Sequence, residues 1–309
     1  MKVFVAGASG AIGRPLVRRL VAEGHEVTGM TRSAGRADEI RALGGEPAVC
    51  DVFDRDALTD ALRRAAPDAI VHQLTSLPPV LDTKRPETYE ATNRLRSEGT
   101  RLLLEAGAEV GGVKRFLAQS VAFLYAPTGG WVKSEEAPIL RGIPGPFGNA
   151  MRAITDLEAQ VLGADGIVLR YGYFYGPGTH YAADGQYGEM VRRRRFPVVG
   201  RGEGRFSFIH TDDAAAATAA ALERGAPGVY NVTDDEPAPM REWLPVYAAA
   251  LGAPKPLRVP GWLAAWFAGK AAVSMATTMR GASNAKAKEA FGCEPELRSW
   301  REGFRTTLG

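Results

Sequence analysis

A glycine-rich turn lies between an apolar run and a helical pattern at the start of the chain. Val3-Phe4-Val5 is followed closely by Gly7-Ala8-Ser9-Gly10-Ala11-Ile12-Gly13, and a helical pattern begins directly afterwards. Glycines at this spacing permit a tight turn, let the backbone approach a ligand and allow the helix to pack closely on the strand. Free amides at the helix start, with the helix dipole behind them, then hold phosphate oxygens. The turn therefore predicts a strand, a dinucleotide-binding loop and a helix.

The alternation of strand and helix continues through the first half of the chain. Short β-rich runs at 26–30, 46–50, 69–72 and 115–120 alternate with helical patterns at 37–43, 55–64 and 88–108. This rhythm predicts a parallel sheet with helices on both faces. We therefore expect an α/β fold, a Rossmann doubly wound parallel sheet with a smaller C-terminal substrate lobe.

The second half of the chain is less regular. A stretch rich in Gly and Pro, 127–148, precedes a helix at 151–162 and a strand at 167–171. After Gly176 we expect a helix near 188–195, a short strand near 207–209 and an Ala-rich helix at 214–224. We interpret residues 1–176 as mainly the dinucleotide-binding domain and residues 177–309 as mainly a substrate-binding lobe, interleaved with the sheet.

Composition excludes several classes of protein. The chain has 309 residues, 45% hydrophobic and 24% charged, which is typical of a soluble globular enzyme. A net charge of +3 does not indicate nucleic-acid binding, and Cys50 and Cys293 lack metal-ligand spacing. We expect a cytoplasmic protein with no metal and no membrane partner, and homodimer formation stays open. The apolar segment 262–279 is too short and interrupted for a membrane span, so we expect it to pack as a helix.

The end of the second predicted strand bears on the choice of cofactor. NAD-selective proteins of this type place an acid there to bind the ribose hydroxyls. Here the strand ends in Thr31-Arg32-Ser33, with no acid. Arg32 can offer a bidentate donor fork to a 2′-phosphate, which favours NADP(H), with NAD(H) as the alternative. Arg32 and the nearby Arg36 could instead be solvated loop residues.

The expected cofactor contacts lie at the ends of successive strands. Asp51 and Val52, after the third strand, are placed to contact the adenine. The full predicted set is Gly7, Ser9, Gly10, Ala11, Ile12, Gly13, Thr31, Arg32, Ser33, Asp51, Val52, Gln73, Leu74 and Thr75.

Several motifs together resemble the extended short-chain dehydrogenases/reductases of the NAD-dependent epimerase/dehydratase group. They are the Gly-x-x-Gly-x-x-Gly turn, Cys50-Asp51-Val52, Val71-His72-Gln73-Leu74, Glu98-Gly99-Thr100-Arg101-Leu102-Leu103, Leu169-Arg170-Tyr171-Gly172-Tyr173-Phe174-Tyr175-Gly176-Pro177-Gly178, Phe208-Ile209-His210-Thr211-Asp212-Asp213-Ala214 and Gly228-Val229-Tyr230-Asn231-Val232. The resemblance covers nearly the whole chain. It implies hydride exchange at a carbinol or carbonyl, with a Tyr-x-x-x-Lys pair and a Ser or Thr that handle the proton.

The proton-handling pair of that family is missing here. None of the nine tyrosines has a lysine four residues later. Aligning the helix 151–162 on the family's glutamate, Glu158, puts Ala150 at the tyrosine position and Ile154 at the lysine position. Either Ser120 or Val121 can be aligned with the family's Ser or Thr. The resemblance therefore supports the fold and the cofactor better than the chemistry.

Other residues could take over the proton transfer. Tyr173 replaces a frequent family Asn just after the sixth strand and is our leading proton-donor candidate, although it could simply line the pocket. Ser120 could hydrogen-bond a substrate carbonyl or satisfy internal groups. We expect His72 to be structural. The loop with His180 and Tyr181 could cover a substrate or lie in solvent.

Two further features have open interpretations. We expect Tyr125 to pack. Arg192 to Arg195 cannot all face one ligand, because successive helical residues point about 100° apart. A solvated helix end is favoured over an anionic substrate site for this run.

Three functions remain in competition at this point. The first is an NADP(H)-dependent oxidoreductase that acts on a small carbonyl or hydroxyl compound with a non-standard proton donor. The second is an epimerase or dehydratase that uses the cofactor transiently, which needs an internal base. The third is a non-catalytic NADP(H)-binding sensor. We favour the first, because hydride transfer depends mainly on position and on the cofactor.

Overall fold

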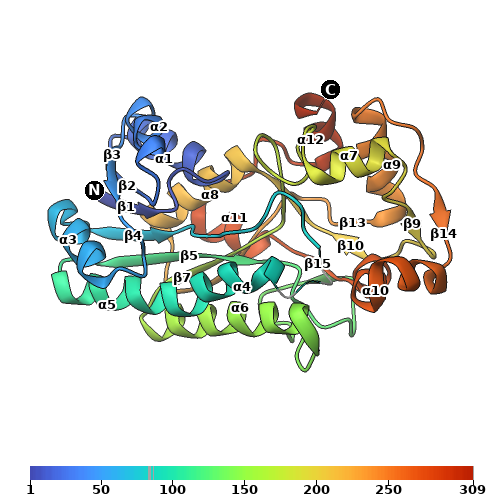
Figure 1. Ribbon diagram of the computed structural model, residues 1–309, viewed down its shortest axis with the longest axis horizontal. Helices are drawn as coiled ribbons and strands as arrows, with labels where there is room; N and C mark the ends of the chain where they lie inside the picture. The colour runs from blue at the N-terminus through green and yellow to red at the C-terminus, as the bar shows by residue number, and fades with distance from the viewer. Residues whose placement is uncertain (83–84, 86, 309) are drawn as a thin grey trace.

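Seven parallel strands form the central sheet of the protein (Figure 1). The computed structural model describes residues 1–82, 85 and 87–308, and only the backbone of residues 268, 270 and 271. The strands are β1 Lys2–Ala6, β2 Glu26–Thr31, β3 Glu46–Val49, β4 Ala69–His72, β5 Arg115–Val121, β7 Ile167–Tyr171 and β12 Gly228–Val232. They lie in the order β12-β7-β5-β4-β1-β2-β3, so the chain order reverses between β1 and β4. Such a reversal opens a crevice for ligands at the carboxyl ends of the strands.

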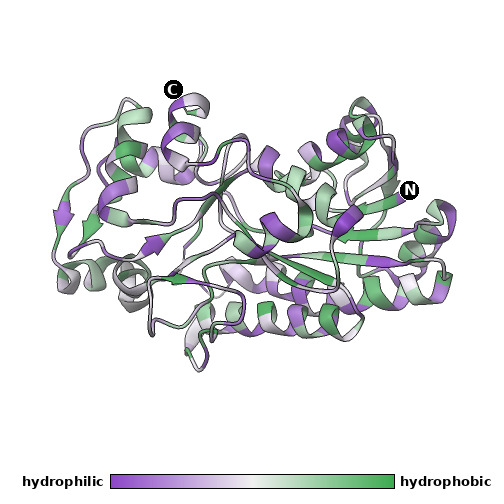
Figure 2. Ribbon diagram, turned by 180° about the vertical axis from the view of Figure 1, so that it is seen from behind, coloured by the Kyte–Doolittle hydropathy of each residue, from purple (hydrophilic) through white to green (hydrophobic). Residues whose placement is uncertain are grey.

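Helices cover both faces of this sheet (Figure 1). One face carries α1 Gly13–Ala22, α2 Ala37–Ala42, α8 Thr211–Arg224 and α11 Ala285–Phe291, and the other carries α3 Arg55–Ala65, α4 Glu87–Arg94, α5 Thr100–Val110 and α6 Gly145–Gly163. The strands between them are buried almost throughout and hydrophobic, whereas the helices carry hydrophilic bands (Figure 2). This burial is typical of parallel sheets covered on both sides. The predicted Rossmann doubly wound sheet is confirmed.

Two helices differ from their predicted bounds. α6 begins at Gly145, inside the segment that we predicted to interrupt the rhythm. A proline in the first turn of a helix loses no intrahelical hydrogen bond, so Pro146 is tolerated there. The predicted helix 88–108 is α4 and α5 joined by a π-helical turn, Leu95–Gly99. Such turns add one residue to the helix and are frequent at functional sites.

A second core holds the C-terminal lobe together. It is built from packed aromatic rings, with Trp243 and Phe208 fully buried at its centre. Its elements are α7 Gln186–Arg192, α9 Met240–Ala250, α10 Gly261–Thr278, α12 Trp300–Thr307 and the strand pairs β8 Tyr173–Tyr175 with β11 Phe208–His210, β9 Val198–Val199 with β14 Arg258–Val259, and β10 Arg205–Phe206 with β13 Ala238–Pro239. A further pair joins β6 Val132–Lys133 to β15 Gly281–Ala282. Residues beyond Gly176 thus build this lobe and also supply α8, β12 and α11 to the sheet, while the exact domain boundary stays a prediction.

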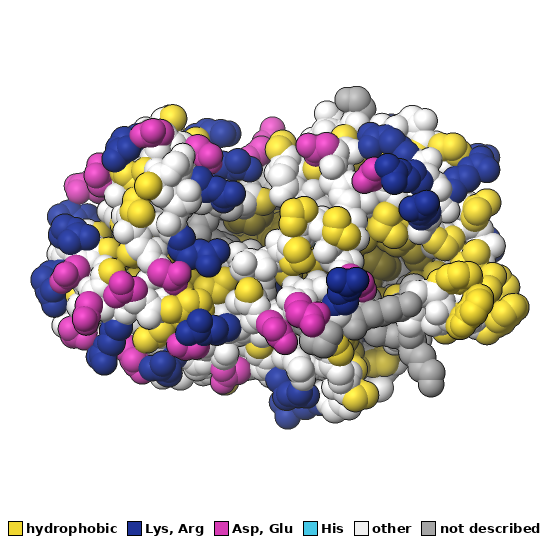
Figure 3. All heavy atoms as spheres, viewed as in Figure 1, with side chains coloured by type: hydrophobic (Ala, Val, Ile, Leu, Met, Phe, Trp, Pro, Cys, Tyr) yellow, Lys and Arg dark blue, Asp and Glu magenta, His cyan; other side chains and the backbone are white. Residues whose placement is uncertain are grey.

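The apolar segment 262–279 forms α10, which is broken at Gly269. Ala264 and Ala276 are buried in the second core, but Trp262 and Trp266 are 75% and 77% exposed. Figure 3 shows hydrophobic side chains gathered at this end of the molecule. The expectation that the segment packs as a helix is therefore wrong for one of its faces. No helix among the described residues is both long enough and apolar enough to cross a membrane.

The arginine run lies at the end of α7. Arg192 to Arg195 are all exposed, Arg192 donates to the Ala183 carbonyl, and Arg193 forms an ion pair with Glu189. This placement agrees with a solvated helix end.

Two glycines in helices differ sharply in the space around them, which gives a test of the second core. A Cβ at Gly303 in α12 would overlap the phenol oxygen of Tyr175, whereas a Cβ at Gly163 in α6 would meet nothing within 4 Å. We expect Gly303→Ala to lower the free energy of unfolding by about 2 kcal/mol or more, because the Tyr175 ring is fully buried and cannot yield. Gly163→Ala should raise it by about 0.5 kcal/mol. Urea denaturation measures both, and equal effects would contradict the packing described.

Candidate functional site

The loop between β1 and α1 has the backbone geometry of a phosphate cradle. Gly7 adopts a φ of +94°, and a Cβ there would lie 2.8 Å from the backbone of Gln73. A Cβ at Gly13 would overlap the Gly7 carbonyl, so helix and strand approach as closely as glycine allows. Among the described residues, the amides of Ala11 and Ile12 donate to no other group. These amides at the start of α1 fit the pyrophosphate of a dinucleotide.

The predicted cofactor contacts all lie along one edge of the sheet. The four segments 7–13, 31–33, 51–52 and 73–75 follow β1, β2, β3 and β4, which are neighbours in the order β4-β1-β2-β3. Carboxyl ends of parallel strands meet at the same edge, so tertiary structure brings these segments together.

The end of β2 offers an unpaired cation. Ser9 and Thr31 are linked through their hydroxyls at 3.4 Å, and the Ser33 amide donates to the Thr31 hydroxyl at 3.3 Å. Arg32 follows Thr31 directly, is exposed, and makes no hydrogen bond or ion pair with any residue that the structure describes. The exposed Arg36 has no side-chain hydrogen bond or ion pair within the described chain, and its amide donates to the Ser33 carbonyl. A cation in this position fits a 2′-phosphate.

The segments after β3 and β4 form the neighbouring parts of the edge. Asp51 is partly buried and accepts a hydrogen bond from the Phe53 amide at 3.0 Å, while Val52 is buried. The Gln73 side chain turns inward and donates to the Tyr171 hydroxyl at 3.2 Å. The backbone of Gln73 faces Gly7. Leu74 is partly buried and Thr75 is exposed, which leaves both open to the crevice.

His72 is structural, as expected from its sequence context. Its Nε2 lies 3.1 Å from the Thr100 hydroxyl, and its Nδ1 accepts the Leu74 amide at 3.2 Å. Burial lowers the pKa of His72 to about 4, so the ring is neutral at physiological pH. Both ring nitrogens have partners, and the residue has no free group for proton transfer.

A buried ion pair fixes the rotation of α6. Both Glu158 carboxylate oxygens accept from Arg170 on β7, at 2.8 and 2.7 Å. Ser120 on β5 donates to the same carboxylate at 2.6 Å. Arg170 also donates to Tyr125, which donates to Asn231 at 2.6 Å. This network ties α6 to three strands of the sheet, and it confirms the expectation that Tyr125 packs.

Ser120 is withdrawn from the candidate catalytic set. Its hydroxyl is buried and engaged by Glu158, on the side of β5 that faces α6. To donate to a substrate carbonyl, its single hydroxyl proton would have to leave Glu158. The structure therefore favours the alignment in which Val121 stands at the family's Ser or Thr position.

The three positions that would handle a proton are apolar and buried. Ala150 is 4% exposed, and Ile154 packs with Val121 and Met151 in a small hydrophobic cluster. Within this cluster and Ala150, there is no side-chain hydroxyl or amine to lower a phenol pKa or to donate a proton.

Tyr173, on β8, lies among aromatic rings. Its ring stacks on Phe123 with centroids 4.6 Å apart, and its hydroxyl donates to the Met279 sulfur at 3.4 Å. Burial raises the pKa of Tyr173 well above its usual range, so the phenol stays protonated at neutral pH. The raised pKa makes this phenol a weaker acid, while its weak thioether partner leaves the hydroxyl able to hydrogen-bond a ligand.

The loop after β4 and the loop around His180 are joined. His180 lies 3.0 Å from the Pro78 carbonyl, and the Gln186 side chain binds both the amide and the carbonyl of Leu81, at 2.7 and 3.2 Å. Tyr181 is buried in the second core, so it is not a solvated loop residue. Figure 3 shows the surface between the sheet and the lobe hollowed and lined with hydrophobic side chains.

Sequence reasoning missed two arginines near the site. Arg14 directly follows the last glycine of the loop, and its guanidinium lies against Gly178. Arg96 is buried in the π-helical turn. Position after a glycine motif could have signalled Arg14. Its charge hides the burial of Arg96 from sequence reasoning, because an arginine on a helix is normally solvated.

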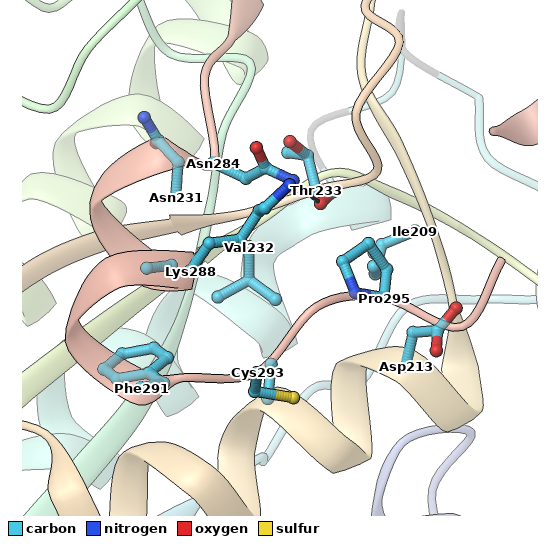
Figure 4. Close-up of a pocket in the computed structure, with 12 residues that line it drawn as sticks. Ile209, Asp213, Asn231, Val232, Thr233, Asn284, Lys288, Phe291, Cys293 and Pro295 are labelled. Atoms are coloured by element: carbon cyan, nitrogen blue, oxygen red, sulfur yellow. Dashed lines mark hydrogen bonds between the residues drawn. The ribbon is translucent and has the colours of Figure 1, made fainter. Parts of the chain in front are cut away.

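A small cavity elsewhere in the molecule is not the substrate site. It has a volume of about 20 Å³ and lies between α8, β12 and α11, lined in part by Asp213, Asn284, Lys288 and Cys293 (Figure 4). That volume has room for about one water molecule.

Comparisons with known proteins identify the family of this chain. The model of the NAD dependent epimerase/dehydratase family matches residues 3–233. A Streptomyces protein, 3-diazoavenalumate denitrifying reductase, is 45% identical over 98% of this chain and 99% of its own length. The 2-alkyl-3-oxoalkanoate reductase of Stenotrophomonas maltophilia is 28% identical over 82% of this chain and 77% of its own.

Solved structures match the fold. A human epimerase family protein with NADPH has a TM-score of 0.75 at 22% identity and covers 99% of both chains. The combined matches in sequence and fold extend over the sheet and the lobe. The chain belongs to the NAD-dependent epimerase/dehydratase family.

Proposed function

We propose that this chain is an NADPH-dependent reductase whose acceptor takes up a hydride without receiving a proton from the protein. An aryl diazo compound is the acceptor class that we favour. The observation that carries the proposal is the apolar set Val121, Ala150 and Ile154 beside an intact cofactor loop.

The cofactor part of the proposal rests on the β1–α1 loop and on Arg32. A bound reduced nicotinamide supplies a hydride. The glycine cradle fits its pyrophosphate, and the unpaired Arg32 with no acid at the end of β2 favours the 2′-phosphate of NADP(H) over the free hydroxyl of NAD(H). NAD(H) remains the alternative.

The acceptor part rests on the proton balance of the reaction. A carbonyl that becomes an alcohol needs one hydride and one proton, and the protein usually supplies the proton. An aryldiazonium ion that gains one hydride yields the arene and dinitrogen, so charge and atoms balance with no added proton. A site without a proton donor is therefore suited to reduction of a diazonium ion and poorly suited to reduction of a carbonyl.

The Streptomyces relative supports this acceptor class. Its name denotes a reductase that removes nitrogen from a diazo compound, and the substrate name ends as the anion of an acid does. At 45% identity over nearly the whole of both chains, related chemistry is the simplest expectation.

A second candidate is reduction of a carbonyl with Tyr173 as the acid. The specific observation in its favour is that the Tyr173 hydroxyl binds a weak thioether acceptor, which leaves its proton easily transferred to another hydrogen-bond partner. The epimerase, dehydratase and sensor alternatives have no such observation, since an epimerase needs a base that the described site lacks. Homodimer formation and a cytoplasmic location stay predictions.

The cofactor assignment predicts a selective effect at Arg32. Arg32→Ala should weaken NADPH binding about tenfold or more, because a charge-assisted bond to phosphate is lost, and should leave NADH binding nearly unchanged. Arg36→Ala, an exposed arginine four residues later, is the matched control. Fluorescence titration measures all the affinities. Tighter binding of NADH than of NADPH to the unaltered protein would contradict the assignment.

The acceptor assignment predicts turnover with a diazonium salt. With diazotised 3-amino-4-hydroxybenzoate, we expect NADPH oxidation in step with dinitrogen release, above the rate without protein. Aliphatic ketones of similar size should react at least about a hundredfold more slowly, since they need an acid. Absorbance of NADPH and mass spectrometry of ¹⁵N-labelled gas give the two rates. Oxidation with ketones alone would overturn the proposal in favour of the second candidate.

The second candidate makes its own prediction at Tyr173. If Tyr173 is the acid, Tyr173→Phe should lower ketone turnover about a hundredfold, because the proton donor is removed. Tyr230→Phe removes a phenol that binds only the Ala226 carbonyl, and serves as the control. Unchanged ketone turnover in Tyr173→Phe would eliminate this candidate.

A further inference from the structure

Arg96 is a buried cation with no side-chain partner among the residues that the structure describes. It is 8% exposed, and its side chain makes no hydrogen bond or ion pair with any residue that the structure describes. None of its side-chain nitrogens is both fully buried and without a partner. The guanidinium therefore keeps a small contact with solvent. Arg170, the other buried arginine of the described chain, is held by both oxygens of Glu158. A carboxylate of the protein therefore neutralises Arg170, whereas no described carboxylate neutralises Arg96.

The helix face that carries Arg96 borders the crevice at the end of β4. Thr92, one turn before Arg96, accepts a hydrogen bond from the Ser76 amide at 2.9 Å. Thr100, one turn after it, lies 3.1 Å from His72 at the end of β4. Arg96 lies between these two contacts, on the side of the helix that faces the loop 73–82. That loop also carries the predicted cofactor contacts Leu74 and Thr75.

Arg96 carries a positive charge that no described carboxylate neutralises. Its charged and titratable neighbours are Tyr89 and His72, and the described residues bring no carboxylate to it. Burial lowers the pKa of Arg96 to about 10, which leaves it protonated at neutral pH. The neighbouring His72 is neutral. A buried, unmatched guanidinium is costly to a fold, so its presence points to an anion that arrives with a ligand.

The surroundings of Arg96 narrow the kind of anion. Tyr89 interacts electrostatically with Arg96 and also with Tyr173 and Tyr187. Tyr173 in turn stacks on Phe123 with ring centroids 4.6 Å apart. The cofactor phosphates have their own sites at the glycine loop and Arg32. A planar guanidinium binds a carboxylate through two parallel bonds, and aromatic rings pack well on another ring.

We propose that Arg96 binds the carboxylate of an aromatic acid and thereby selects acidic substrates for this site. The inference deepens the proposed function and rests on it for the claim that the bound acid is a substrate. The carboxylate accepts from the guanidinium while the ring lies among Tyr89, Tyr173 and Phe123. The substrate carboxylate replaces solvent as the partner of the Arg96 guanidinium, for which the described residues supply no carboxylate.

Binding to the full chain saturated with NADP⁺ tests the proposal. The probes are 4-hydroxybenzoate and its neutral amide, measured by calorimetry on the unaltered protein and on Arg96→Met, Arg96→Lys and Arg101→Gln. Arg101 is an exposed arginine one turn away that pairs with Glu105, so it controls for loss of charge. We expect the unaltered protein and Arg101→Gln to bind the acid at least about tenfold more tightly than the amide.

The two Arg96 variants separate charge from geometry. Arg96→Met should bind acid and amide equally, and Arg96→Lys should keep part of the preference, because an ammonium retains charge but not the planar fork. Thermal denaturation without ligand should show Arg96→Met melting about 2–4 °C higher than the unaltered protein, which also proves that it folds. Equal binding of acid and amide by the unaltered protein, or a preference unchanged in Arg96→Met, would overturn the proposal.

Turnover distinguishes this inference from the proposed function. If diazotised 3-amino-4-hydroxybenzoate and its methyl ester are reduced with equal kcat/KM, Arg96 does not select acids, although the reductase function stands. If no acceptor oxidises NADPH but the acid preference in binding persists and depends on Arg96, the acid site stands and the reductase function fails. Reduction of the acid at least about tenfold more efficiently than the ester supports both.

Discussion

The position of the candidate site depends on the buried pair between Glu158 and Arg170. Both charges are removed from water, and the pair is stable only because each carboxylate oxygen has a donor and each side of the guanidinium has an acceptor. Ser120 on β5, Asn231 on β12 and Tyr125 in the loop after β5 complete this set. The pair therefore does more than join one helix to one strand, because it fixes the rotation of α6 over the whole sheet.

That rotation decides what the sheet edge contains. Residues four and eight positions before Glu158 lie on the same helix face, so Ile154 and Ala150 must also turn toward the sheet. In the family that the chain belongs to, those two positions would carry a lysine and a tyrosine. Here they extend a hydrophobic cluster to Val121. The framework that would orient a proton-transfer pair is complete, and the pair itself is replaced by apolar side chains.

Charge is matched in one part of this molecule and unmatched in another. At Arg170 the fold supplies its own carboxylate, so the charge is part of the architecture. At Arg96 and Arg32 the described chain supplies none. Arg32 follows β2 at the edge of the sheet that the glycine loop defines, and Arg96 lies in the helix whose Thr92 and Thr100 contact Ser76 and His72. Cations without a carboxylate partner favour the binding of anionic ligands. The apolar set Val121, Ala150 and Ile154 favours a reductase that transfers a hydride to its acceptor without donating a proton.

The sequence by itself determined the features that are local in the chain. The glycine turn, the strand-helix rhythm, the absence of an acid after Thr31 and the lack of any Tyr-x-x-x-Lys pair are all readable without coordinates, because each depends on residues close in sequence. From them follow the Rossmann sheet and the cofactor loop, and both agree with the structure. The helix at 145–163 was predicted to start six residues late, since Gly and Pro hide a helix start when Pro falls in the first turn.

Only the tertiary structure decided where side chains point. Ser120 and Val121 are neighbours in sequence, and nothing local shows that Ser120 turns to Glu158, which is 38 residues away. Arg96 is buried although a charged side chain is normally solvated, and only the packing of its helix reveals that burial. Trp262 and Trp266 of α10 are exposed, although their apolar character alone favours burial. Partners distant in sequence set these orientations, so they become visible only when the chain is folded.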